Sequence, residues 1–182
     1  MHERRCGTSC DLTVLRSWYE RVTDEWGDCG RGALDDDGEV MGFIKYAPSG
    51  YFPQAATFPA RPPSGDTVLI ACLHIRDDAR GQGLGRLLVH AALKDLKSRG
   101  ERSVQSFASA GPFDPAVMPM IGMKYLLNQG FSVVRPDPAF PLMQLDLRSL
   151  AMLAENLEAM LESLRAPLRA PSRVPDPTTR AR

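Results

Sequence analysis

Three alternating glycines mark the segment of the chain that is best suited to chemistry. Gly81, Gly83 and Gly85 follow an apolar, strand-like run that ends at residue 75, and an amphipathic stretch begins directly after them. Glycines at the start of a helix let backbone N–H groups approach an anion closely, and the helix dipole places partial positive charge at the same point. The segment therefore predicts a binding site for a phosphate or pyrophosphate.

The spacing of these glycines excludes two familiar phosphate-binding loops. The dinucleotide pattern G-x-G-x-x-G would need a glycine where the chain has Arg86, and the P-loop would need the letters G-K-[ST]. The chain instead has R-x-x-G-x-G over residues 80–85, between the strand-like run and the amphipathic stretch. In that setting the motif resembles the acyl-CoA-binding motif of the GNAT superfamily of N-acetyltransferases. A glycine loop that merely turns the chain is the competing interpretation.

The resemblance extends from about residue 11 to residue 147. A helix, a hairpin, a long strand, the motif helix, a strand, a helix followed by Gly130-Phe131 and a final pair of strands come in the family's order. This order implies an α/β (α+β) fold of the GNAT type, in which helices flank a mixed, mostly antiparallel central sheet. The residues before Leu12 show no pattern for the family's first strand. Either that strand lies upstream, or the sheet edge is open or completed by a neighbour.

The resemblance also implies an acetyl-CoA site that can be placed on this sequence. Backbone amides of the loop from Arg80 to Arg86 would hold the pyrophosphate, and the end of the preceding strand would pair with the pantetheine arm like an added strand. A main-chain N–H there would polarise the thioester carbonyl. The cofactor-binding candidates are Leu73, His74, Ile75, Arg80, Gly81, Gln82, Gly83, Leu84, Gly85 and Arg86. The side chains of Arg80 and Arg86 either add charge near the phosphates or are solvated.

The catalytic residues are harder to assign, because two positions depart from the family's pattern. The place of the catalytic glutamate in the family's histone acetyltransferases falls at about Leu69, which cannot act as a base. The family's thiol-protonating tyrosine lies four residues before the glycine of Gly-Phe, a position taken here by Leu126. Tyr125 is one place away, and adjacent helix positions point about 100° apart, so packing is favoured over catalysis for Tyr125. Tyr125 and His74 are nevertheless the two catalytic candidates.

An amine acceptor must lose a proton to react, so a base or a water relay is needed. His74 is flanked by two apolar residues of the strand and is expected to point to the opposite sheet face from them. A buried, hydrogen-bonded histidine is the competing interpretation. The other base candidates are Glu20, Glu25, Tyr46 and Tyr51.

Periodicity and turn residues predict the elements that position these groups. The expected helices cover residues 12–22, 84–98 and 117–128, and the expected strands cover 33–34, 40–46, 67–75, 103–107, 131–135 and 142–147. Residues 35–39, an acidic run that contains Gly38, are expected to form the turn of a hairpin. Residues 47–66 are rich in proline, glycine and aromatics and are expected to lack regular structure, as binding loops often do.

The composition limits the class of protein. The 182 residues carry 22 basic and 22 acidic side chains, which argues against a general nucleic-acid binder or a membrane-surface binder. No apolar run approaches the roughly 18–20 residues of a membrane span, so a cytoplasmic protein is expected. The four cysteines Cys6, Cys10, Cys29 and Cys72 lack the paired spacing of a zinc site, and no metal is expected.

Residues 1–148 are expected to form the acetyltransferase domain, followed by an amphipathic helix over 149–166 and a disordered tail over 167–182. The apolar seam of that helix is equally compatible with dimerisation and with packing on the chain's own domain. The leading hypothesis is an N-acetyltransferase that moves an acetyl group from acetyl-CoA to an amine of a small molecule or protein, by direct transfer in a ternary complex. The alternative is a non-catalytic, regulatory acyl-CoA-binding module of the same fold.

Overall fold

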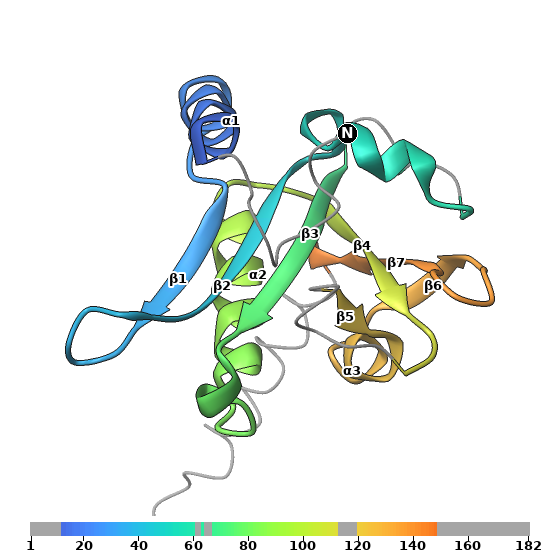
Figure 1. Ribbon diagram of the computed structural model, residues 1–182. Coiled ribbons are helices and arrows are strands. Elements are labelled where there is room, and N and C mark those ends of the chain that lie inside the picture. The colour runs from blue at the N-terminus through green and yellow to red at the C-terminus, as the bar shows by residue number, and fades with distance from the viewer. Residues whose placement is uncertain (1–11, 61–62, 64–66, 113–119, 149–182) are drawn as a thin grey trace, which may run out of the picture. The chain divides into compact units, whose positions relative to one another are not determined.

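A computed structural model describes residues 12–60, 63, 67–112 and 120–148, all within the first of two compact units, residues 1–149 (Figure 1). In chain order the elements are α1 (Leu12–Glu25), β1 (Gly30–Leu34), β2 (Val40–Pro48), the 3₁₀ turns η1 (Ser49–Tyr51) and η2 (Pro53–Thr57), β3 (Val68–Ile75), the 3₁₀ turn η3 (Asp77–Ala79), α2 (Leu84–Ser98), β4 (Ser103–Ser109), β5 (Ile121–Gly122), α3 (Met123–Asn128), β6 (Ser132–Arg135) and β7 (Leu142–Asp146). The helix and tail predicted after residue 148 lie outside the described residues, as do Cys6 and Cys10.

The strands form one mixed sheet in the order β1-β2-β3-β4-β7-β6, with β5 paired to β4 beside this path. β4 runs parallel to β3 and to β5, and every other pair is antiparallel. The predicted mixed, mostly antiparallel sheet flanked by helices is therefore confirmed. β1 forms one edge of this sheet among the described residues, so the question of an additional N-terminal strand stays with the residues before Leu12.

The two central strands separate partway along their length. β3 pairs with β4 only over Val68–Ile70, whereas β4 continues to Ser109 alongside β7 and β5. In the same region β3 pairs with β2 alone, and a β-bulge at Ala71 shifts its register. Among the described residues, the second half of β3 therefore has no strand paired to its edge facing β4, and Figure 1 shows the two strands diverging. We call the opening between them the slot.

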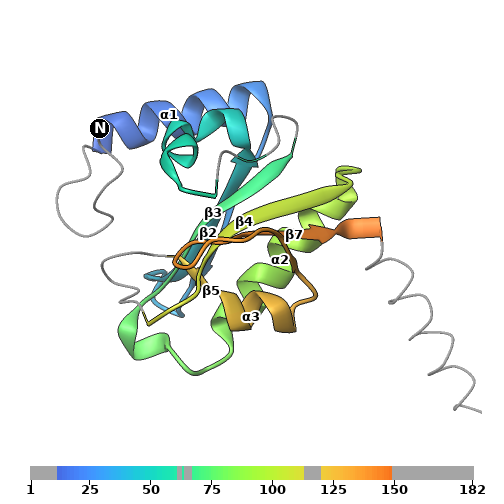
Figure 2. The same cartoon turned by 90° about the vertical axis from the view of Figure 1, so that its right-hand side faces the viewer.

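Each face of the sheet is covered by different elements, as Figure 2 shows. On one side, which we call the α2 face, α2 packs against β1, β2 and β3. On the other side, which we call the α1 face, α1 and the turns η1 and η2 enclose a buried cluster. Its members are Val22, Cys29, Ala47, Phe52, Ala55, Ala60, Leu69, Phe107 and Leu142. The slot lies between these two layers.

Two differences from the predicted elements have clear physical reasons. β1 begins at Gly30, before the predicted strand, because its backbone lies so close to β2 that a Cβ there would be 2.8 Å from the Ile44 carbonyl oxygen. Because glycine has a low strand propensity, the sequence analysis did not include Gly30 in the strand. The segment predicted to lack regular structure contains η1 and η2, and Pro53 begins η2 because its fixed φ suits a first helical turn. No described helix is long and apolar enough to cross a membrane.

A polar network ties α2 to the first two strands. Asp95 on α2 accepts a hydrogen bond from the Tyr46 hydroxyl (2.7 Å) and pairs with Arg31 and with Arg99 (2.8 Å). The Arg99 guanidinium also lies 4.6 Å from the centre of the Trp26 ring. Burial, together with the nearby Asp95 carboxylate, raises the pKa of Tyr46 well above its ordinary value. One carboxylate thus compensates two guanidinium groups and one buried hydroxyl.

Asp95→Asn should lower the free energy of unfolding by about 2 kcal/mol, because hydrogen bonds to a charged group are lost and two arginines lose their counter-charge. Chemical denaturation monitored by circular dichroism measures this. Asp28→Asn is a suitable control, since its pair with Arg31 is long at 3.4 Å and exposed. Equal stabilities for the two variants would show that the network contributes no more than a surface pair.

Candidate active site

A cavity of about 360 Å³ lies where the slot, the glycine loop and α3 meet. Its lining residues come from β3, the loop and start of α2, and the segment from residue 120 to α3. They are Leu73, Ile75, Ala79, Arg80, Gly81, Gly83, Leu84, Gly85, Arg86, Met120, Ile121, Gly122 and Tyr125. Most of the cofactor-binding candidates from the sequence are therefore neighbours in space, and the volume is typical of small-molecule pockets.

The backbone of the glycine loop leaves its amides accessible. Gly81 and Gly83 have φ values of +77° and +83°, and a Cβ added to either residue would meet nothing within 4 Å. Gly83 is the N-cap of α2, and its carbonyl accepts the first hydrogen bond of the helix, from Leu87 (3.1 Å). The loop thus presents open backbone at a helix N-terminus, the arrangement that favours an anionic ligand.

Two polar side chains of the motif hold the loop in place. The Arg80 Nε donates to the Ile75 carbonyl (3.2 Å), and its guanidinium pairs with Asp77 (2.8 Å). The Gln82 side chain donates to the Asp78 carbonyl (3.0 Å). Gln82 does not line the cavity, whereas Arg80 and the exposed Arg86 do. The roles of these residues toward a ligand stay predictions.

Tyr125 lines the cavity, whereas its neighbour Leu126 is fully buried in the core. The Tyr125 hydroxyl oxygen is buried and has no hydrogen-bond partner in the described part of the chain. Burial raises the pKa of Tyr125, and the positive charge of Arg86 partly opposes this effect. A buried donor without a partner is costly unless a ligand supplies an acceptor. The structure therefore places Tyr125 at the cavity wall, and its catalytic role stays a prediction.

His74 lies on the other side of the sheet from the cavity. Leu73 and Ile75 line the cavity, while His74 is half-buried with its ring centre 5.5 Å from that of Phe43, the residue opposite it on β2. Phe43 shares a face with Lys45, whose ammonium lies 4.8 Å from the Trp18 ring centre of α1. The His74 side chain is therefore on the α1 face, as its position in the strand predicted. Only its backbone can take part in the cofactor-side contacts.

The remaining base candidates are engaged elsewhere. Tyr46 is fully buried against Asp95. The Tyr51 hydroxyl donates to Glu25 (2.8 Å), and Glu20 pairs with Arg16 (2.8 Å) at the surface. Leu69, at the family's glutamate position, is buried in the core cluster.

The predicted helix over 117–128 was wrong at residues 120–122, because α3 begins only at Met123 and Met120, Ile121 and Gly122 form a wall of the cavity. β5 is only two residues long and carries no periodic pattern, so no sequence signal marks it. Met120 lines the cavity and also packs against the cluster on the α1 face, so it borders both sides of the slot. Cys29 and Cys72 are both buried. Within the described ranges, no three His, Cys, Asp or Glu side chains are grouped as a metal site would require.

Solved structures share the fold at low sequence identity. Chaetomium thermophilum Naa20, solved in complex with a bisubstrate analogue, is 19% identical, with a TM-score of 0.52 over 78% of this chain and 76% of that one. A structure described as a bacterial toxin is 15% identical, with a TM-score of 0.52 over 85% of this chain and 87% of that one. Similarity at this level shows the fold alone.

No curated protein matches the chain in sequence. The family model described as "Acetyltransferase (GNAT) family" matches residues 5–117, which include the first four strands, the glycine loop and α2. Members of this family use acetyl-CoA and acetylate amine acceptors. With the motif, the sheet order and the model in agreement, the chain belongs to the GNAT family of acetyltransferases.

Proposed function

We propose that this protein transfers the acetyl group of acetyl-CoA to an amine by direct attack in a ternary complex. The observation that carries the proposal is the cavity at the glycine loop, where the Tyr125 hydroxyl has no hydrogen-bond partner among the described residues. Open amides at the start of α2 suit the pyrophosphate, and the free edge of β3 suits the pantetheine arm as an added strand.

The slot between β3 and β4 would suit direct transfer. Acetyl-CoA would occupy the cavity, and the acceptor amine would approach from the α1 face, where His74 lies. Because Met120 borders both sides, the two substrates can meet within the slot without a covalent enzyme intermediate. The amine nitrogen attacks the thioester carbon, the C–S bond breaks, and the sulfur leaves as CoA thiolate.

Two protons must move in this reaction. Tyr125 would donate one to the departing sulfur, since its raised pKa keeps the phenol protonated at neutral pH. His74, directly or through water, would take the proton that the amine loses. The strand N–H groups facing the slot would stabilise the oxyanion that develops on the thioester oxygen.

Calorimetric titration with acetyl-CoA, followed by a thiol-release assay with small amines, aminoglycosides and peptides, tests the proposal. We expect saturable binding and thiol release that depends on an acceptor. Absence of acetyl-CoA binding would overturn the proposal. Binding without release for any acceptor would instead support the non-catalytic module.

His74→Ala should lower kcat by about a hundredfold, the lower range for loss of a general base, and leave the KM for acetyl-CoA unchanged. Steady-state kinetics with the best acceptor of the panel measures both. His90→Ala is the matched control, because His90 is exposed on α2 and contacts Gln129 (2.9 Å) away from the slot. Equal kcat values for the two variants would remove His74 from the reaction.

A further inference from the structure

Ser106 is a buried polar residue of β4 that the proposed function does not yet use. It lies at the point where the slot begins, and only 1% of its surface is exposed. Ile70 and Ser106 form the last pair between β3 and β4. The next residue, Phe107, is paired with Leu142 on β7 and with no residue of β3. Ser106 therefore marks the place where the two strands part, which we call the fork.

The Ser106 hydroxyl lies between two backbone carbonyls at the fork. Its oxygen is 3.1 Å from the carbonyl oxygen of Ile70 on β3 and 3.1 Å from that of Phe107 on β4. The Ala108 amide donates to Pro141 on the β7 side (3.0 Å), and successive strand residues turn their backbone groups to alternate edges, so the Phe107 carbonyl faces the slot. A hydroxyl donates one proton, which can go to either carbonyl. The hydroxyl thus links the two strands exactly where their backbones diverge.

This link is the last one along the β3–β4 pair. Removal of the hydroxyl would take a donor from two carbonyls in a place that water does not reach, and a buried acceptor that loses its donor is costly. A shift of the strands relative to each other would relieve this cost. Because the pairing of β3 with β4 ends at Ile70 and Ser106, no later pair would resist such a shift.

Both strands lead from the fork to the walls of the cavity at the glycine loop. Leu73 and Ile75, which line it, follow the fork on β3, and β4 continues to its pairing with Ile121 and Gly122 of β5, which also line it. A change in the separation of the strands would therefore move the walls of this cavity. The glycine loop itself lies beyond the end of β3 and depends on its own contacts, such as that of Arg80 with the Ile75 carbonyl.

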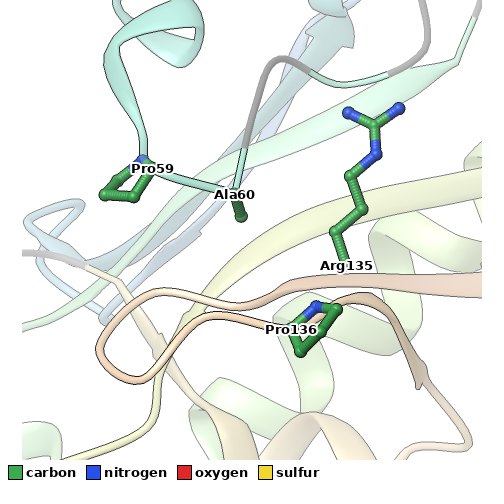
Figure 3. A pocket seen from close by; sticks show the side chains of 4 residues that line it. All are labelled: Pro59, Ala60, Arg135 and Pro136. Atoms are coloured by element: carbon green, nitrogen blue, oxygen red, sulfur yellow. The ribbon is translucent and has the colours of Figure 1, made fainter.

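A second cavity, of about 400 Å³, does not depend on the fork. It lies between the segment after η2 and the end of β6, and Figure 3 shows its lining residues, Pro59, Ala60, Arg135 and Pro136. None of them lines the cavity at the glycine loop. Its one charged side chain, Arg135, already takes part in another interaction. The fork is therefore the feature that bears on the slot.

We infer that Ser106 is a positioning residue whose hydroxyl sets the separation of β3 and β4, and thereby the fit of the slot to the pantetheine arm of acetyl-CoA. This inference rests on the proposed function. Ser106 acts through the backbone of the two strands and does not itself line the cavity.

The test compares the binding of two probes, acetyl-CoA and ADP, by calorimetric titration. ADP has a pyrophosphate but no pantetheine arm, so it reports on the glycine loop without the slot. Ser106→Ala should weaken acetyl-CoA binding about tenfold, the effect of one lost hydrogen bond, and leave ADP binding unchanged. With an acceptor present, kcat for thiol release should also fall by about tenfold or more, because a small misplacement of the thioester slows the reaction.

Two further variants separate positioning from stability. Ser106→Thr keeps the hydroxyl on a residue that suits a strand, so most of the acetyl-CoA affinity should return. Ser109→Ala is the matched control, because Ser109 lies on the same strand, is 6% exposed and donates to the Gly111 carbonyl (3.0 Å), not to β3. Both alanine variants should lose similar stability in chemical denaturation, but only Ser106→Ala should change the ratio of acetyl-CoA to ADP affinity.

The outcomes distinguish this inference from the proposed function. Wild-type acetyl-CoA affinity in Ser106→Ala would overturn the inference, as would equal weakening of acetyl-CoA and ADP, which would show that Ser106 serves only the stability of the fold. A similar change of the affinity ratio in Ser109→Ala would also overturn it. Failure of the wild-type protein to bind acetyl-CoA would overturn the proposed function and, with it, this inference.

Discussion

Gly83→Val should reduce acetyl-CoA binding by at least about a hundredfold, equivalent to roughly 3 kcal/mol, while the domain stays folded. Gly83, the N-cap of α2, has a φ of +83°, a conformation that an L side chain disfavours. The valine side chain would project into space that is now open, beside the amides that face the cavity. Both effects act on the surface that we propose holds the pyrophosphate. Calorimetric titration with acetyl-CoA measures the loss.

Gly100→Val provides a control with the same backbone strain. Gly100 lies just past the other end of α2, with a φ of +79° and, like Gly83, open space around an added Cβ. Both substitutions should destabilise the domain by about 1–2 kcal/mol, because both force valine into the left-handed region. Only Gly83→Val should weaken acetyl-CoA binding. If both variants bind acetyl-CoA as the wild type does, the proposed phosphate site at the loop is wrong.

The glycine loop also shows how far sequence can lead. The motif, its strand and its helix could be predicted because each depends on local chemistry: apolar periodicity, positive φ and the helix start. The motif gives no reason to distinguish the three glycines, but the structure shows that their backbone conformations differ. Gly81 and Gly83 have positive φ, whereas a Cβ on Gly85 would make an ordinary 3.6 Å contact with Leu73. Backbone conformation therefore explains glycine at positions 81 and 83, whereas neither φ nor the space around an added Cβ requires it at Gly85.

What sequence could not supply depends on contacts between distant segments. The wall formed by Met120 and β5 exists only because the chain returns beside β4. The neighbours of β4 likewise depend on the strand order, which places β7 between β4 and β6. Tyr125 was judged from its offset to Gly130, but its role depends on which side of α3 faces the cavity. That orientation is set by the burial of Leu126 in the core.

Tyr125→Phe should lower kcat by about a hundredfold or more and leave the KM for acetyl-CoA nearly unchanged. The substitution removes one oxygen and keeps the ring, so the cavity wall is preserved. The Tyr125 hydroxyl is the one buried polar group lining the cavity that has no partner within the described residues. A departing thiolate would supply the missing acceptor, and only during the reaction would the hydroxyl gain this contact.

The same variant should be at least as stable as the wild type. A buried hydroxyl without a partner contributes a desolvation cost and no hydrogen bond, so its removal costs nothing in the free protein. Loss of activity together with unchanged or raised stability separates a catalytic role from a packing role. Leu126→Ala is the contrasting control, since truncating this fully buried side chain should lower the free energy of unfolding by about 2–5 kcal/mol.

The pH dependence provides an independent check on the role of Tyr125. Burial raises the pKa of Tyr125 above its ordinary value of about 10, so the phenol holds its proton throughout the neutral range. The contribution of Tyr125 to kcat should therefore be fully present below pH 10 and decline only as the pH rises through the raised pKa. The ratio of wild-type to Tyr125→Phe kcat should stay constant from pH 6 to 9, because the donor does not titrate there. A ratio that falls within this range, or a variant with wild-type kcat, would show that another group protonates the leaving sulfur.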